Sequence, residues 1–107
     1  MAPFSVRSEA GVVYLSGVFD LASVPTFTEE TSQVLVGHGD IVLDLADVAS
    51  ISSSGVLAIL SLARCVGGRR FVLRRPQPHV AKVFDMMRLA DVPGIEIDSS
   101  GPGDSEP

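Results

Sequence analysis

Three consecutive serines, Ser52, Ser53 and Ser54, are followed by Gly55 and then by the strongly apolar segment 56–66. Serine is favoured at a helix N-cap, where its side chain accepts a hydrogen bond from the helix backbone. A helix start also presents unpaired N–H groups and the positive end of the helix dipole, which together favour anions such as phosphate. The serine run therefore predicts the start of a helix, and its hydroxyls could cap that helix or carry a phosphoryl group.

Nucleophilic catalysis by Ser53 is the enzymatic alternative. The strand-to-helix turn that exposes such a nucleophile has the pattern Gly-x-Ser-x-Gly. Gly55 fits this pattern, but Ile51 stands where the first glycine belongs, and the two histidines, His38 and His79, lie on unrelated segments. We therefore expect no catalytic residues and no enzyme activity.

Metal and cofactor chemistry also lacks its usual signals. Cys65 is the one cysteine, so it forms no internal disulfide framework and no cysteine-based zinc site. Neither histidine is followed by another histidine four residues later, and no glycine-rich loop of the Walker or dinucleotide-binding type is present. We expect no bound metal and no cofactor.

A strand must bring the serines to the surface. The nearly continuous apolar run 41–45 is typical of a central strand buried on both faces, and we expect 46–51 to be a loop leading to the serines. Sites in open α/β sheets gather at the carboxyl ends of strands. The serine run is therefore expected at that edge of the sheet.

The remaining elements alternate between strands and helices. We expect a β-hairpin at 4–8 and 12–19, a helix capped by Ser23 that ends near Gly37, a strand at 71–73, a helix at 78–89 and a strand at 95–97. This order predicts an α/β fold in one domain, residues 1–97, with a mostly parallel sheet, an antiparallel edge hairpin and helices packed against the sheet. Residues 98–107 carry no large apolar side chain and are expected to form a disordered acidic tail.

Composition narrows the function further. The chain has 107 residues, of which 46% are hydrophobic and 20% charged, so it can bury one core. Its formal net charge is −5, whereas a nucleic-acid binder should be clearly basic. We also expect no signal peptide and no membrane insertion, because the longest apolar-rich stretch falls far short of the roughly 20 residues that span a bilayer. These features predict a cytoplasmic protein.

Three segments, in order along the chain, carry a family signature. Residues 41–57, IVLDLADVASISSSGVL, read as a strand followed by a pattern close to Leu-Ser-x-Val-x-Phe-Ile-Asp-Ser-Ser-Gly-Leu-Gly and a helix. Residues 16–22, SGVFDLA, are similar to a Gly-Glu-Leu-Asp strand end, and residues 78–89, PHVAKVFDMMRL, to a third helix. Over residues 4–97 the chain thus resembles the STAS domain family, and more narrowly the anti-sigma factor antagonists.

This resemblance implies a function and a site. Such an antagonist binds an anti-sigma factor that is also a serine kinase, which releases the sigma factor and permits transcription. The kinase inactivates the antagonist by phosphorylating the first serine of Asp-Ser-Ser-Gly, which corresponds to Ser53, and a phosphatase reverses the reaction. Ser54 and Gly55 match the rest of the motif, and Asp20 matches an aspartate at a strand end near the acceptor. The implied partner-binding surface is Asp20, Ser52, Ser53, Ser54 and Gly55.

One departure from the family pattern bears on this reading. Ser52 stands where the antagonists have an aspartate, which removes a negative charge beside the acceptor. A kinase that reads this charge would phosphorylate the chain poorly or take Ser52 instead. An alternative therefore stays open: a non-switching STAS interaction subunit of a lipid-transport or stress-signalling assembly, in which the helix start docks a partner constitutively.

A phosphate on Ser53 is expected to leave the fold intact. Phosphoserine adds about −1.5 to −2 charges, and negative charge is locally favourable at a helix N-terminus. The added charge is therefore expected to act within the partner interface, through repulsion and desolvation.

Overall fold

The computed structural model describes residues 3–37 and 39–98. The strands are β1 (Ser5–Glu9), β2 (Val12–Phe19), β3 (Ile41–Ile51), β4 (Phe71–Arg74) and β5 (Ile95–Asp98). The helices are α1 (Val24–Thr31), α2 (Ser53–Cys65) and α3 (Pro78–Met86), with 3-10 turns η1 (Leu21–Ser23), η2 (Ser32–Val36) and η3 (Leu89–Asp91).

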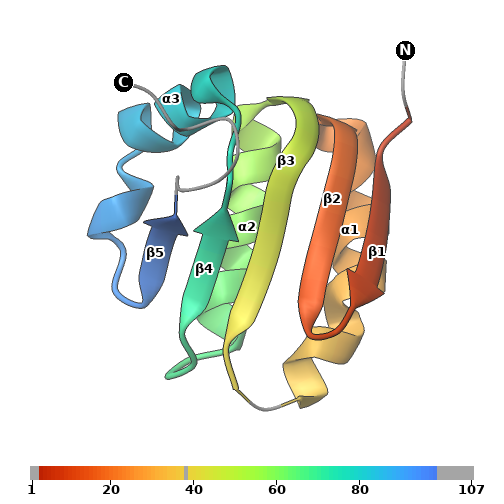
Figure 1. Ribbon diagram of the computed structural model, residues 1–107, viewed down its shortest axis with the longest axis vertical. Coiled ribbons are helices and arrows are strands. Elements are labelled where there is room, and N and C mark those ends of the chain that lie inside the picture. The colour runs from red at the N-terminus through yellow and green to blue at the C-terminus, as the bar shows by residue number, and fades with distance from the viewer. Residues whose placement is uncertain (1–2, 38, 99–107) are drawn as a thin grey trace.

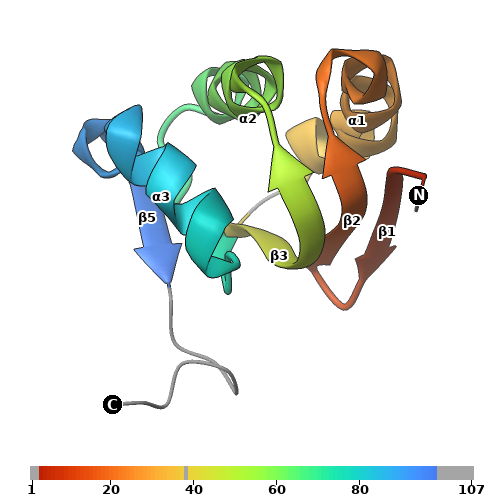
Figure 2. The same cartoon turned by 90° about the horizontal axis from the view of Figure 1, so that it is seen from above.

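The strands form one sheet in the order β1-β2-β3-β4-β5. β1 pairs antiparallel with β2, and the other neighbours pair in parallel. Helices α1 and α2 lie behind the sheet in Figure 1 and above it in Figure 2, on the same face. The expected α/β fold, with a mostly parallel sheet and an antiparallel edge hairpin, is confirmed.

The core lies between the sheet and the helices. Along β2 burial alternates, so that Val13, Leu15 and Phe19 face inward while the residues between them are partly exposed. The helices contribute apolar side chains to the same cluster, among them Phe27, Val56, Ile59, Leu62, Val80 and Phe84.

The expected loop at 46–51 is wrong, because β3 continues as a strand to Ile51. Its second half pairs with β2, as in the partners Gly17↔Val48 and Phe19↔Ile51, whereas β4 pairs with β3 only as far as Asp44. A strand with one strand neighbour needs no continuous apolar run. For this reason its mixed sequence resembled a loop.

Several details at the ends of elements differ from expectation. Ser23 is the N-cap residue of α1, as expected, but its side chain does not cap the helix; its hydroxyl instead donates to the Val18 carbonyl at 2.8 Å. Beyond Thr31 the first helix continues only as the 3-10 turn η2, and α3 ends at Met86 rather than at 89. β5 includes Asp98, so the expected tail boundary at 98 is wrong, and residues 99–107 lie outside the described part of the chain.

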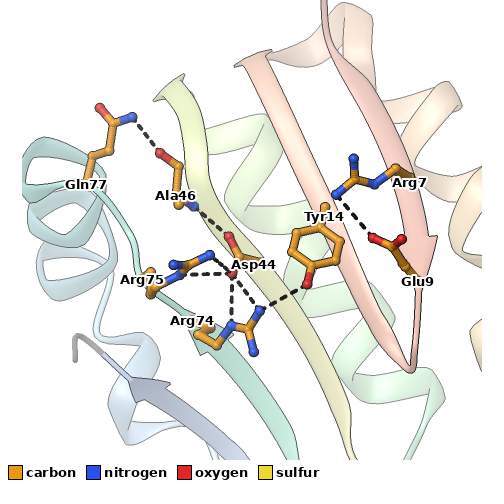
Figure 3. A network of polar contacts seen from close by, with 8 residues as sticks. All are labelled: Arg7, Glu9, Tyr14, Asp44, Ala46, Arg74, Arg75 and Gln77. Atoms are coloured by element: carbon orange, nitrogen blue, oxygen red, sulfur yellow. Dashed lines mark hydrogen bonds and ion pairs between the residues drawn. The ribbon is translucent and has the colours of Figure 1, made fainter. Parts of the chain in front are cut away.

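A buried carboxylate, that of Asp44, stabilises the irregular segment between the first and the second half of β3 (Figure 3). The sheet register shifts between the pairs Tyr14↔Asp44 and Ser16↔Asp47, so β3 holds an extra residue here. Asp44 Oδ1 accepts a hydrogen bond from the Ala46 N–H at 3.0 Å, which satisfies a backbone donor at this bulge. Asp44 therefore compensates locally for the irregular strand pairing.

Two guanidinium groups compensate the charge of this carboxylate. Arg74 donates to Asp44 Oδ2 through Nε at 2.9 Å, and Arg75 donates to the same oxygen through a terminal nitrogen at 2.8 Å. Burial alone would raise the pKa of Asp44, but the Ala46 N–H and the Arg75 and Arg74 side chains together hold that pKa below its ordinary value of 3.8. Asp44 is therefore ionised in the folded protein at neutral pH.

Acid is expected to weaken the fold through Asp44. A carboxylate whose pKa is lower in the folded chain stabilises the fold above its ordinary pKa of 3.8, and the stabilisation is lost as the pH falls through the folded pKa. For one proton the unfolding free energy falls by at most about 1.4 kcal/mol per pH unit. Urea unfolding from about pH 5 to about pH 2 measures this slope, and Asp44→Asn should make it shallower. Equal slopes in the two proteins would contradict the assignment.

Candidate partner-binding site

The serine run lies where β3 gives way to α2. Ser52 is the N-cap of α2, and its Oγ accepts a hydrogen bond from the Gly55 N–H at 3.3 Å. The Ser52 N–H donates to the carbonyl of Phe19, the last residue of β2, at 2.9 Å. The helix start is therefore joined directly to the end of the neighbouring strand.

Ser53 and Ser54 differ in their exposure. Ser53 is the first residue of α2 and its side chain is exposed, whereas Ser54 and the capping Ser52 are partly buried. No hydrogen bond within the described residues engages the Ser53 hydroxyl. This hydroxyl is therefore open to another protein, at a position where the helix start favours negative charge.

Gly55 lets the first turn of α2 pack closely against β2. A Cβ atom at this position would lie 2.8 Å from the Phe19 carbonyl oxygen and 2.8 Å from Ile51 Cγ1. Real Cβ atoms do not come this close to a backbone oxygen, so the helix start would have to move. The glycine thus positions the serines against the ends of β2 and β3.

Replacing Gly55 with alanine is expected to destabilise the fold by about 1–3 kcal/mol, the usual cost of overpacking a close contact. The intrinsic preference of helices for alanine over glycine acts in the opposite direction, but by only about 1 kcal/mol. Urea unfolding measures the difference. Gly67→Ala is a suitable control, because the nearest atom to a Cβ there is a carbonyl oxygen 4.0 Å away. An equally stable Gly55→Ala variant would contradict the close packing.

Asp20 follows directly on Phe19, so it lies beside the helix start. It is the N-cap of η1, and its Oδ1 lies 3.2 Å from the Ser23 hydroxyl oxygen, whose one hydrogen is shared between this carboxylate and the closer Val18 carbonyl. The Ser23 N–H also donates to the Asp20 carbonyl at 2.9 Å. These bonds fix the backbone turn at the end of β2 and orient the Asp20 carboxylate.

Two exposed leucines beside these residues were not identified from the sequence. Leu21, next to Asp20, is 71% exposed, and Leu57, four residues after Ser53 on α2, is 56% exposed. Single exposed leucines are common on protein surfaces, so these two side chains do not by themselves mark an interface, but they give the surface beside the serines an apolar part. In the sequence Leu57 belongs to an apolar helix, and nothing in that pattern distinguishes an exposed leucine from a buried one.

Within residues 3–37 and 39–98, no histidine is hydrogen-bonded to the Ser53 hydroxyl. His79 is hydrogen-bonded to the Ala49 carbonyl and not to the Ser53 hydroxyl. Among the described residues no group of three or more His, Cys, Asp or Glu side chains is placed to hold a metal ion. Nor does any helix in residues 3–37 or 39–98 have the length and apolar character to cross a membrane.

Comparisons with known proteins agree with this architecture. A family model described as "Mlab, STAS domain" matches residues 4–97. No curated protein sequence matches the chain. Among solved structures, the fold is similar to that of a Thermotoga maritima protein assigned as an anti-sigma factor antagonist, with a TM-score of 0.71 and 24% identity over 89% of this chain and 86% of that chain.

The unphosphorylated form of the anti-sigma factor antagonist SpoIIAA is similar to the same degree. Its TM-score is 0.71 at 24% identity, over 89% of this chain and 87% of that chain. At this identity the structures establish the shared fold, while the family model covers nearly all of the described residues. The chain therefore belongs to the STAS domain family.

Proposed function

We propose that this STAS domain is an anti-sigma factor antagonist that is switched off by phosphorylation of Ser53. In its unphosphorylated form it binds an anti-sigma factor with serine kinase activity, and the sigma factor is released to support transcription in the cytoplasm. The fold shared with proteins described as anti-sigma factor antagonists supports the partner class. The domain itself catalyses nothing in this scheme.

The observation that carries the proposal is the different engagement of the serine hydroxyls. A kinase needs an acceptor oxygen that it can reach. Ser52 uses its hydroxyl as the helix cap and Ser54 is partly buried, whereas Ser53 is exposed. We infer that Ser53 is the acceptor and that Ser52, although it replaces the usual aspartate, serves the helix instead.

The reaction needs only a kinase and ATP. The Ser53 Oγ attacks the γ-phosphorus of ATP, a new oxygen–phosphorus bond forms, ADP leaves, and the hydroxyl proton passes to a base of the kinase. A phosphatase later hydrolyses the phosphoserine and restores the hydroxyl. The helix start tolerates the product, because its dipole and free N–H groups favour the added negative charge.

Phosphorylation is expected to weaken binding through the surface around Ser53. This surface comprises Asp20, Leu21, Ser52–Ser54 and Leu57, and it holds one carboxylate and two exposed leucines. Gly55, which the family resemblance also placed in the partner-binding surface, is buried, so it supports this surface from below. An apolar interface loses affinity when a charge within it must be desolvated, and Asp20 would add like-charge repulsion. The switch therefore needs no change of fold.

Phosphorylation can be tested directly with the purified chain. The ATPase-like anti-sigma factors of its own organism, with magnesium and ATP, should add one phosphoryl group, seen by intact-mass spectrometry and located at Ser53 by fragmentation. Ser53→Ala should remain unmodified, while Ser61→Ala, the matched control at an exposed serine of α2 outside this surface, should be modified like the parent. A kinase that phosphorylates an established substrate but leaves this chain unmodified would overturn the switch.

A second candidate, the non-switching interaction subunit, is favoured by two observations. Ser52 stands in place of the aspartate that precedes the acceptor serine in antagonists. In addition, the matching family model carries the name Mlab and not that of an antagonist. In this case the same surface binds its partner permanently. The two candidates differ in one measurement: an isolated complex that is stable to ATP and contains unmodified Ser53 supports the second.

A further inference from the structure

The second half of β3, from 45 to 51, has a strand neighbour on one side only. β2 pairs along its length, but β4 leaves the sheet after Arg74, which is the partner of Asp44. The carbonyl groups of β3 that point away from β2 therefore need other hydrogen-bond donors. This half of β3 leads directly into the cap residue of α2, so its path sets the position of Ser53.

Two register shifts make this path irregular. Between Tyr14 and Ser16 the partners on β3 advance from Asp44 to Asp47, one residue more than β2 does. Between Gly17 and Val18 they advance from Val48 to Ser50, again with one residue in excess. Each shift leaves backbone groups outside the regular ladder and bends the strand.

The start of α3 supplies a side-chain donor at each shift. Gln77, the N-cap of α3, donates through Nε2 to the Ala46 carbonyl at 2.9 Å, as Figure 3 shows. His79, in the first turn, donates a hydrogen bond from Nε2 to the Ala49 carbonyl. Ala46 and Ala49 lie inside the two shifted intervals. Gln77 and His79 thus take the place of a neighbouring strand.

We propose that Gln77 and His79 are positioning residues for Ser53. They hold the bent half of β3 in the path that delivers the Ser52 N–H to the Phe19 carbonyl, and so they fix where α2 begins. The consequence for phosphorylation rests on the proposed function. The effect of Gln77 and His79 on the path of β3 and the start of α2 does not. α3 thereby controls the geometry of a site to which it contributes no residue.

The two contacts are suited to this role because they lie at the surface. Gln77 is partly buried and His79 is exposed, and the core residues of α3 are instead Val80 and Phe84. Removing either polar side chain therefore leaves the packing of α3 intact. The effect should be confined to the strand end and the helix start that follows it.

Amide hydrogen exchange of the full chain, followed by NMR, tests the proposal without any partner. In Gln77→Ala and in His79→Ala, the amides of Ser52, Gly55 and Val56 should exchange about three- to tenfold faster, the range expected for one lost hydrogen bond. Amides of β3 before the first shift and of the far end of α2 should keep their parent rates. Lys82→Ala, an exposed change on the same helix, is the control and should alter neither group.

Conservative variants distinguish the effect of the hydrogen-bond donor from the effect of side-chain size. His79→Gln keeps an N–H donor and should restore parent exchange rates, while Gln77→Glu is similar in size but offers no N–H at neutral pH and should behave like Gln77→Ala. Unchanged exchange at Ser52, Gly55 and Val56 would overturn the proposal. An equal increase across the whole domain would also overturn it, because both contacts would then be merely structural.

Phosphorylation kinetics test whether the positions of Gln77 and His79 affect the reactivity of Ser53. With a kinase that modifies the parent chain, Gln77→Ala and His79→Ala should lower kcat by about three- to tenfold and leave KM unchanged, because a displaced acceptor oxygen slows transfer more than binding. Unchanged kcat despite faster exchange would refute the link to Ser53. If the parent chain is not phosphorylated, only the proposed function is refuted. The positioning role of Gln77 and His79 is still decided by amide hydrogen exchange.

Discussion

The Ser53→Asp variant is expected to fold like the parent and to bind its anti-sigma partner at least about 30-fold more weakly, the effect of about 2 kcal/mol for a charge placed in an interface. Ser53 is exposed at the first position of α2, where a carboxylate interacts favourably with the helix dipole. The substitution should therefore leave the unfolding free energy unchanged or slightly higher. Calorimetric titration and urea unfolding measure the two quantities.

Two controls make the result specific. Ser53→Ala removes the hydroxyl without adding charge, so it should bind like the parent while resisting the kinase. Ser8→Asp adds the same charge at an exposed position of β1 and should bind normally. Ser8 pairs with Val13 near the start of β2, whereas the start of α2 lies beside Phe19 at the other end of that strand. A folded Ser53→Asp variant with parent affinity would disprove the charge mechanism and would favour the non-switching subunit.

The sequence predicted the strands whose residue types match their burial. A β-rich run at 12–19 predicted β2, and the nearly continuous apolar run at 41–45 predicted the centre of the sheet. The start of α2 was predicted from serines and a glycine ahead of an apolar segment, because capping chemistry is local. Local signals of this kind also led to the correct assignment of the family.

Features that depend on distant contacts were not predictable. The second half of β3 was missed because its extended shape is maintained by pairing with β2, about thirty residues away, and by side chains of α3. The exposure of Leu21 and Leu57 depends on which helix faces remain uncovered. Asp44 looked like a polar interruption in an apolar strand, and only the fold brings Arg74 and Arg75 to it.

Asp44→Ala is expected to cost about 2–4 kcal/mol of unfolding free energy, the largest effect on stability that we predict. Removing one member of a buried charge cluster typically costs about 3–5 kcal/mol, and Arg74 and Arg75 reduce this because their side chains are 30% and 33% exposed and can turn toward water. The Ala46 N–H also loses its acceptor. Urea unfolding at neutral pH gives the value.

Comparison of three carboxylate variants tests the cause of this loss. Asp44→Asn keeps an oxygen for the Ala46 N–H but removes the charge, so its stability should lie between those of the parent and Asp44→Ala. Asp40→Asn removes a carboxylate that pairs with Arg70 at 3.0 Å, but both side chains are about half exposed, so the unfolding free energy should hardly change. Burial, and not the mere presence of an ion pair, then accounts for the difference. Equal losses at Asp40 and Asp44 would show instead that surface charge balance stabilises this sheet.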